Sequence, residues 1–197
     1  MTSRHIKILA AVVILLFGVM YALNTTDRSP PGTEPGLIVP ELKAHLNDLE
    51  AVTVVYGDAD AGGEVTIVRE DEDWRVQDKS GYPADTGALR QLLIAIAEAN
   101  KVEQKTSNPS LYDRLGVQHP AEEGGDGVLV EGTAPDFTFS LIVGDRTQGD
   151  YRYARVPSEE ASWLIDRSPE LPEDASGWLD SRIVDVPSAD VQSVEIR

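Results

Sequence analysis

A single uncharged, apolar run near the amino terminus limits what this chain can become. Ile8–Leu23 (ILAAVVILLFGVMYAL) has no charged side chain, and the uncharged stretch continues to residue 26 before Asp27. With a rise of about 1.5 Å per residue, a helix of roughly 20 residues crosses the hydrocarbon core of a bilayer. The run therefore predicts a single-pass transmembrane helix. Because Arg4 and Lys7 precede it, the positive-inside rule places the amino terminus in the cytoplasm and the remainder outside.

A cleaved signal peptide is the competing interpretation, since such leaders also place cations before a short apolar run. The small-x-small pattern of a cleavage site does not follow the run, where the residues are Met20–Asn24 (MYALN). We therefore favour a retained anchor, in which Tyr21 suits the membrane interface. Ala11, Gly18 and Ala22 fall on one face of the predicted helix, where small side chains permit close packing on a helix of another membrane subunit.

A segment rich in proline and glycine follows the apolar run. Asp27–Gly36 (DRSPPGTEPG) contains three prolines and two glycines, which is typical of an extended, solvated tether. We therefore predict a cytoplasmic tip and transmembrane anchor at 1–26, a tether at 27–36 and a periplasmic domain at 37–186. The last segment, 187–197, contains a strand candidate, Val191–Arg197, whose apolar spacing resembles that of Leu49–Val54. This strand either begins a second repeat or closes the first sheet.

Residue patterns in the outer part predict more strands than helices. Helical spacing at Pro40–Leu49 and Thr86–Ala99 predicts two helices, the second capped by Asp85. Turns are expected at Gly132–Pro135 and at Gly144–Asp150, where glycine tolerates positive φ. The expected fold class is therefore α+β, with the transmembrane helix followed by a mainly antiparallel β-sheet and one or two packed helices. The predicted strands are Ala51–Tyr56, Val65–Arg69, Trp74–Gln77, Val102–Gln104, Gly127–Glu131, Phe137–Val143, Tyr151–Val156 and Ser162–Asp166.

Charge and composition argue against several classes of function. The chain has 17 Lys plus Arg against 34 Asp plus Glu, a net charge of -17, which opposes nucleic-acid binding. The absence of cysteine excludes disulfides, thiolate metal sites and thiol nucleophiles. The histidines His5, His45 and His119 lie far apart in sequence, which argues against a zinc site. We therefore expect no metal, no cofactor and no catalytic residues.

One strand gathers aromatic and cationic side chains in this acidic chain. Alternation places Tyr151, Tyr153 and Arg155 on one face of the predicted strand, with Arg152 on the other. These three residues are candidates for a ligand or partner surface. In the alternative interpretation the tyrosines line a core and the arginines pair with the abundant acids.

A series of motifs occurs along the chain in fixed order. After the first strand and the Trp74 strand, the motifs are Tyr82–Asp85 before a helix with Leu89, Leu92 and Leu93, then Leu111-Tyr112-x-x-Leu115-Gly116-Val117-x-x-Pro120, Leu141–Gly144, Tyr151-x-Tyr153-x-Arg155, Trp163–Asp166 and Trp178–Asp180.

In this order and spacing, from Leu49 to about Ile183, the chain resembles the bacterial envelope family catalogued as domain of unknown function 4340. The resemblance implies a single membrane anchor, a domain outside the cytoplasmic membrane and, for some members, association with an ABC transport system related to gliding-motility components. It implies no catalytic residues, and the chain stops where longer members would begin a second repeat.

Three hypotheses for the function follow from these features. The leading one is a non-enzymatic subunit of the bacterial inner membrane that contacts other membrane protein subunits through its anchor helix and outer domain, as an accessory to an ABC-type transport system. The second is an extracytoplasmic binding module for a cell-envelope sugar or peptide. The third is an acid–base hydrolase that works through paired carboxylates, which any acidic domain offers as candidates.

Overall fold

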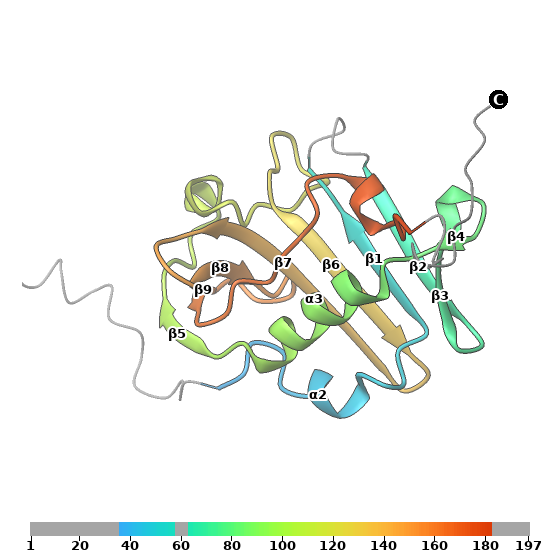
Figure 1. Cartoon of the computed structure of the whole chain (residues 1–197). Helices are drawn as coiled ribbons and strands as arrows, with labels where there is room; N and C mark the ends of the chain where they lie inside the picture. Colours follow the sequence, from blue (N-terminus) through green and yellow to red (C-terminus); the bar gives the residue numbers. More distant parts are fainter. Residues whose placement is uncertain (1–35, 58–62, 183–197) are drawn as a thin grey trace, which may run out of the picture. The chain divides into compact units, whose positions relative to one another are not determined.

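Antiparallel strands form the framework of the part of the chain that follows the predicted tether. The computed structural model describes residues 36–57 and 63–182, all of them within one compact unit, Pro35–Arg197. In this part the strands form one sheet in the order β4-β3-β2-β1-β6-β7-β8-β9-β5 (Figure 1). The strands are β1 (Ala51–Val55), β2 (Glu64–Glu70), β3 (Asp73–Val76), β4 (Tyr82–Pro83), β5 (Lys101–Gln104), β6 (Val128–Ala134), β7 (Phe137–Arg146), β8 (Arg152–Arg155) and β9 (Ser162–Ile165).

Few helices accompany the sheet. They are α2 (Leu42–His45), α3 (Thr86–Glu98) and the short 3-10 turns η2 (Gln77–Lys79), η3 (Pro109–Leu111), η4 (Asp113–Leu115) and η5 (Ala175–Trp178). The prediction of a mainly antiparallel sheet with few helices is confirmed. Within residues 36–57 and 63–182 no helix has the length and apolarity to cross a membrane. The predicted anchor, the predicted tether up to residue 35 and the terminal strand lie outside the described residues, so these remain predictions.

The helix α3 covers one face of the sheet (Figure 1). It begins where the sequence predicts, because the Asp85 carboxylate accepts a hydrogen bond from Ala88 N at 3.0 Å and so caps the first turn. Its apolar residues recur every three or four positions and are buried against the strands. These buried residues are Leu89, Leu92, Leu93, Ile96 and Ala97.

Apolar side chains gather on both faces of the sheet. The main cluster lies between the sheet and the helices α2 and α3, and it includes the fully buried Leu42, Val52 and Trp178. A smaller cluster on the opposite face contains Tyr112, Val117, Leu129 and Ile142. The segment with η3 and η4 therefore closes only part of this second face.

Two predicted turns are placed differently in the structure. The strand β6 continues through Gly132 to Ala134, so the turn to β7 consists of Pro135 and Asp136 instead of Gly132–Pro135. Gly144 lies within β7 instead of in a loop. A Cβ at Gly144 would lie 2.3 Å from the carbonyl oxygen of Leu115. Close approach of another backbone, not positive φ, therefore requires glycine there.

Both ends of the described chain are held against the sheet. Gly36 O accepts from Lys101 N and Ile38 N donates to Ala99 O, each at 2.8 Å, so the chain enters beside the start of β5. At the other end of the domain, Trp178 Nε1 donates to Tyr56 Oη at 2.9 Å. Tyr56 Oη in turn donates to Pro172 O at 2.9 Å. These bonds fasten residues 172–178 beside β1.

Candidate functional site

The predicted surface around β8 is only partly accessible. Tyr153 and Arg155 share one face of the strand, as alternation predicts, and both pack toward the cluster around Tyr112. Arg155 is 6 % exposed, and its guanidinium lies 4.4 Å from the centroid of the Tyr112 ring. Its Nε donates to Val117 O at 3.1 Å. The Arg155 charge is therefore held inside the domain, and Tyr151, 42 % exposed, is the most accessible of the three residues.

The polar groups of Tyr112 and Arg152, next to this surface, also interact with other groups of the domain. Burial raises the pKa of the Tyr112 hydroxyl, and the nearby Arg155 charge partly opposes the increase. Arg152 donates from Nε to Gly144 O at 2.7 Å and from Nη1 to Pro169 O at 2.6 Å. Burial, with the nearby Arg146 charge, lowers the pKa of Arg152. A role for Tyr151, Tyr153 and Arg155 in binding remains a prediction, and the predicted helix face of Ala11, Gly18 and Ala22 lies outside the described residues.

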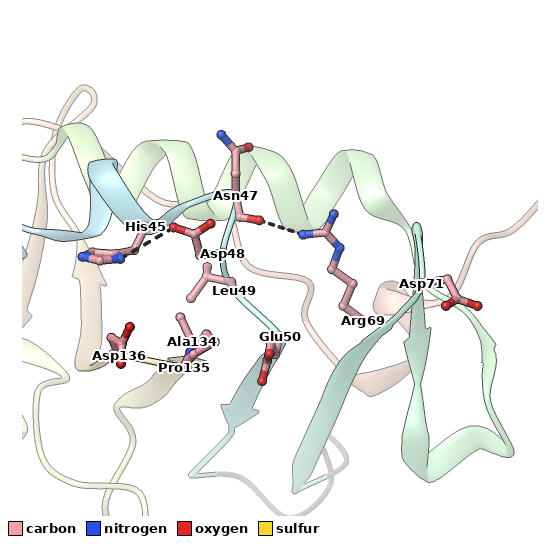
Figure 2. Close-up of a pocket in the computed structure, with 10 residues that line it drawn as sticks. All are labelled: His45, Asn47, Asp48, Leu49, Glu50, Arg69, Asp71, Ala134, Pro135 and Asp136. Atoms are coloured by element: carbon pink, nitrogen blue, oxygen red, sulfur yellow. Dashed lines mark hydrogen bonds and ion pairs between the residues drawn. The ribbon is translucent and has the colours of Figure 1, made fainter.

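An open hollow lies where α2 meets the loops at one end of the sheet (Figure 2). It has a volume of about 680 Å³ and is lined from three segments, residues 45–50, 69–71 and 134–136. The His45 ring stacks on Phe137, with centroids 4.6 Å apart, and His45 Nδ1 lies 3.8 Å from Asp48 Oδ2. Arg69 Nη1 donates to Asn47 O at 2.7 Å, so this cation holds the loop before β1.

Carboxylates dominate the wall of this hollow. Asp48, Glu50, Asp71 and Asp136 line it together with Arg69. Figure 2 shows these carboxylates on three segments, with Asp48 and Glu50 on the same one, and pointing in different directions. Among the described residues no group of three His, Asp or Glu side chains is arranged to hold a metal ion. The hollow can attract a cationic ligand through these carboxylates.

A second depression, which we call the β7 groove, runs beside the first half of β7. It is lined by residues 38–41, 137–140 and 156–159 and has a volume of about 440 Å³. The strand β7 pairs with β6 along residues 137–143, whereas β8 pairs with β7 only at residues 142, 143 and 146. Counting the described strands alone, residues 137–141 therefore have a strand neighbour on one side only.

The backbone groups of Thr138 and Ser140 point into this groove. The turn 135–136 has two residues, so the flanking pair 134–137 is hydrogen-bonded across the hairpin. Hydrogen-bonded and non-hydrogen-bonded pairs alternate along an antiparallel ladder, so the N–H and C=O groups of residues 138 and 140 point away from β6. Within the part of the chain that the structure describes, no backbone group bonds to them on that side.

A proline explains why β8 does not continue along β7. Extending the register would place Pro157 opposite Ser140 and Glu159 opposite Thr138. Proline has no N–H to donate, and Glu159 N donates instead to Val156 O at 2.9 Å. The carbonyl oxygens of Pro157 and Glu159 both lie 3.5 Å from Arg155 Nη1 as hydrogen-bond acceptors. The chain thus turns away from β7 and leaves the groove open.

The walls of the β7 groove differ in polarity. Phe137 and Phe139 project toward the helix side of the sheet, where Ile38 and Val39 add apolar surface. The hydroxyls of Thr138 and Ser140 project toward the opposite face by strand alternation. Ser140 Oγ donates to Glu131 Oε1 there, at 2.8 Å.

Charge in the groove is negative. Glu41 and Glu159 are the ionisable residues of its lining. Glu159 Oε2 lies 3.6 Å from Lys101 Nζ, whereas Glu41 forms no ion pair with any residue in 36–57 or 63–182. The groove is therefore suited to a ligand that carries positive charge.

Sequence reasoning did not identify this groove. The nearest signal was Pro157 directly after a predicted strand, because proline ends strand pairing. Thr138 and Ser140 have no distinctive sequence pattern. Their importance arises from the unequal lengths of β7, ten residues, and β8, four residues.

The fold and groove define an antiparallel α+β domain whose sheet has an interruption beside one long strand. The family described as Domain of unknown function (DUF4340) matches residues 74–197, and the chain belongs to this family. No curated protein and no solved structure shows a significant match to the chain.

Proposed function

We propose that this protein is a membrane-anchored periplasmic subunit that works through contacts with other proteins, as an accessory to an ABC-type transport system in the bacterial inner membrane. The observation that carries the proposal is the β7 groove, an uncovered strand edge between two flanking segments of the outer domain. The apolar run Ile8–Leu23 and the tether Asp27–Gly36 support the anchored arrangement. Arg152 and Arg155, by contrast, are bonded within the domain and serve the framework.

Purification of the full chain in a mild detergent tests this proposal. We expect membrane protein subunits to be retained in stoichiometric amounts, including the permease and ATPase of a transport system, as identified by quantitative mass spectrometry. Recovery of the chain alone, as a single monodisperse species, would contradict the proposal.

The contribution of the anchor can be tested by a pair of variants. Gly18→Leu adds bulk to the predicted packing face and should lower the recovery of partner subunits. Val13→Leu, on the opposite side of the predicted helix, enlarges an apolar side chain by one methylene and should leave recovery unchanged. Equal recovery with both variants would remove the anchor face from the interface.

The open hollow favours a second candidate function, an extracytoplasmic binding module for a cell-envelope sugar or peptide. Its volume of about 680 Å³ is within the range of small-molecule sites, roughly 300–1,000 Å³. The carboxylates favour a cationic or hydroxyl-rich ligand. Equilibrium dialysis of the full chain with purified cell-wall fragments should show saturable binding that Asp136→Asn weakens, and a lack of saturation would contradict this candidate.

A further inference from the structure

We propose that the β7 groove binds an extended, basic peptide segment of a partner protein, which adds to the sheet as an antiparallel strand beside residues 137–141. This inference rests on the proposed function, since it specifies the chemistry of the partner. Strand addition of this kind supplies main-chain hydrogen bonds for affinity and alternate side-chain pockets for specificity.

The main chain of β7 supplies the first part of the recognition. Thr138 and Ser140 each direct one N–H and one C=O into the groove, and such unpaired groups at a sheet edge form a template for another strand. All strand pairs of the sheet are antiparallel, so we assign the same direction to the incoming segment. At about 3.3 Å per residue, five residues of β7 offer roughly 16 Å of edge.

The flanking segments determine what kind of strand can enter. Residues 38–41 and 156–159 line the groove on either side of the edge, so a single extended chain fits better than the edge of a second sheet. Alternate side chains of that peptide would face Phe137 and Phe139, which favours apolar residues at those positions. The intervening side chains would lie on the face of Thr138 and Ser140, which favours polar residues.

Charge selects a basic segment. Glu41 and Glu159 contribute negative charge to the lining of the groove, and the whole chain carries a net charge of -17. A lysine or arginine beside the apolar positions would be attracted by both the local carboxylates and the overall field.

A defined peptide tests the inference with the full chain in detergent micelles. The probe is fluorescein-labelled Lys-Val-Thr-Val-Lys amide, and its Kd is measured by fluorescence polarisation. The alternation places both valines toward the phenylalanines and the threonine opposite β7 residues 138 or 140. We expect saturable binding with a Kd below about 1 mM, an affinity suited to a short segment of a larger partner.

Methylation of the peptide backbone separates strand addition from simple apolar contact. In an antiparallel pair the threonine N–H bonds to β7, whereas the valine N–H groups point away. N-methylation at threonine should therefore raise Kd by about tenfold, while N-methylation at the second valine should have little effect. Equal affinity of the two methylated peptides would overturn the inference.

Variants of the chain provide the matching test. Ser140→Pro removes an N–H that points into the groove but is not used in the β6 ladder, and it should raise Kd by about tenfold. Glu41→Gln should weaken binding severalfold, whereas Glu72→Gln, in the exposed turn between β2 and β3, should not. The unfolding temperature of each variant establishes that it folds, and the methylated peptides decide the matter if Ser140→Pro does not.

The remaining outcomes each contradict the inference. No binding by the natural chain at about 1 mM peptide would overturn it. Binding that appears only after removal of residues 183–197 would mean that the chain's own segment occupies the groove. Protection of the Thr138 and Ser140 amides that grows with protein concentration would instead indicate a second copy. If partners copurify equally with Ser140→Pro, the protein still contacts membrane subunits, as the proposed function requires, but through a surface other than the β7 groove.

Discussion

At the scale of single residues, the buried hydroxyl of Tyr56 joins two parts of the chain that are far apart in sequence. It accepts from Trp178 Nε1 and donates to Pro172 O, each at 2.9 Å. Burial, more than any other factor, raises the pKa of Tyr56, so the neutral form makes both bonds at physiological pH. The hydroxyl therefore helps to hold the segment with η5 against the sheet.

Tyr56→Phe should lower the free energy of unfolding by about 1–3 kcal/mol, because it leaves a buried indole N–H without an acceptor. Urea unfolding monitored by tryptophan fluorescence measures this change. Tyr151→Phe, at an exposed ring, is the control and should alter stability by less than about 0.5 kcal/mol. Similar losses for both variants would contradict this role of Tyr56.

Asp174 is expected to make stability depend on pH. Its carboxylate accepts from Ser176 N at 2.8 Å and from Gly177 N at 3.3 Å, and bonds to Ser176 lower its pKa below the ordinary value of 3.8. A carboxyl whose folded pKa is lowered stabilises the fold above the ordinary pKa. That stabilisation is lost as the pH falls through the lowered value.

Asp174→Ala should therefore unfold at a lower temperature than the natural chain at pH 7. The difference should shrink as the pH falls below about 4, where the unfolded carboxyl becomes protonated, and should be lost once the pH is below the lowered pKa of the folded carboxyl. Asp150→Ala, at an exposed loop position without a hydrogen-bond or ion-pair partner among the described residues, is the control. A difference that stays constant down to pH 2 would show that charge at Asp174 does not matter.

At the scale of elements, local patterns located the helix and most strands. The apolar spacing of Leu89, Leu92 and Ile96 and the capping Asp85 predicted α3. These features act within one or two turns of chain, so sequence alone contains them. The alternation of β8 likewise predicted that Tyr153 and Arg155 share a face.

How deeply a side chain is buried, and how long a strand is, could not be predicted in the same way. Arg155 is buried because residues 112–117, far away in sequence, fold across its face of the sheet. The β6–β7 turn was misplaced because Gly132 was taken as a turn residue, although it lies in the strand against the Phe139 ring. The β7 groove depends on which residues pair between strands, and register is a property of long-range packing.

Gly144 provides a test at this scale. A Cβ there would lie 2.3 Å from Leu115 O and 2.6 Å from Val117 Cγ1, so Gly144→Ala should destabilise the domain by about 1–3 kcal/mol. At Gly132 the nearest atom is Phe139 Cε1, at 2.2 Å. Replacing Phe139 by the smaller leucine should rescue much of the loss in Gly132→Ala, and no comparable rescue exists against a backbone carbonyl. If urea unfolding shows the same free energy of unfolding for Gly144→Ala as for the natural chain, this would contradict the close approach of Leu115 O to residue 144.

At the scale of the whole molecule, the groove, the tether and the charge are consistent with one arrangement. The chain enters the domain at Gly36–Ile38, directly before residues 38–41 that line the β7 groove. Part of the lining of the groove therefore follows the predicted tether directly in sequence. This proximity suits a partner that is itself held at the membrane, because tethering raises the effective concentration of its segment.

Membrane topology is the prediction on which this arrangement depends. The natural chain has no cysteine, so a single introduced cysteine is the only thiol available for labelling. With a membrane-impermeant maleimide on intact spheroplasts, Glu123→Cys, at an exposed position of the domain that we predict to lie outside, should react at once. Thr2→Cys, before the apolar run, should react only after lysis, because the positive-inside rule keeps that end in the cytoplasm.

The pattern of labelling distinguishes the arrangements directly. Labelling of both cysteines in intact spheroplasts would place both ends outside, and labelling of Thr2→Cys alone would reverse the orientation. Intact-mass measurement of the purified chain should give a species that retains residues 8–23, as a permanent anchor requires. A mass that begins after residue 23 would indicate a cleaved leader, and the β7 groove would then have to recruit its partner without the concentration effect of the tether.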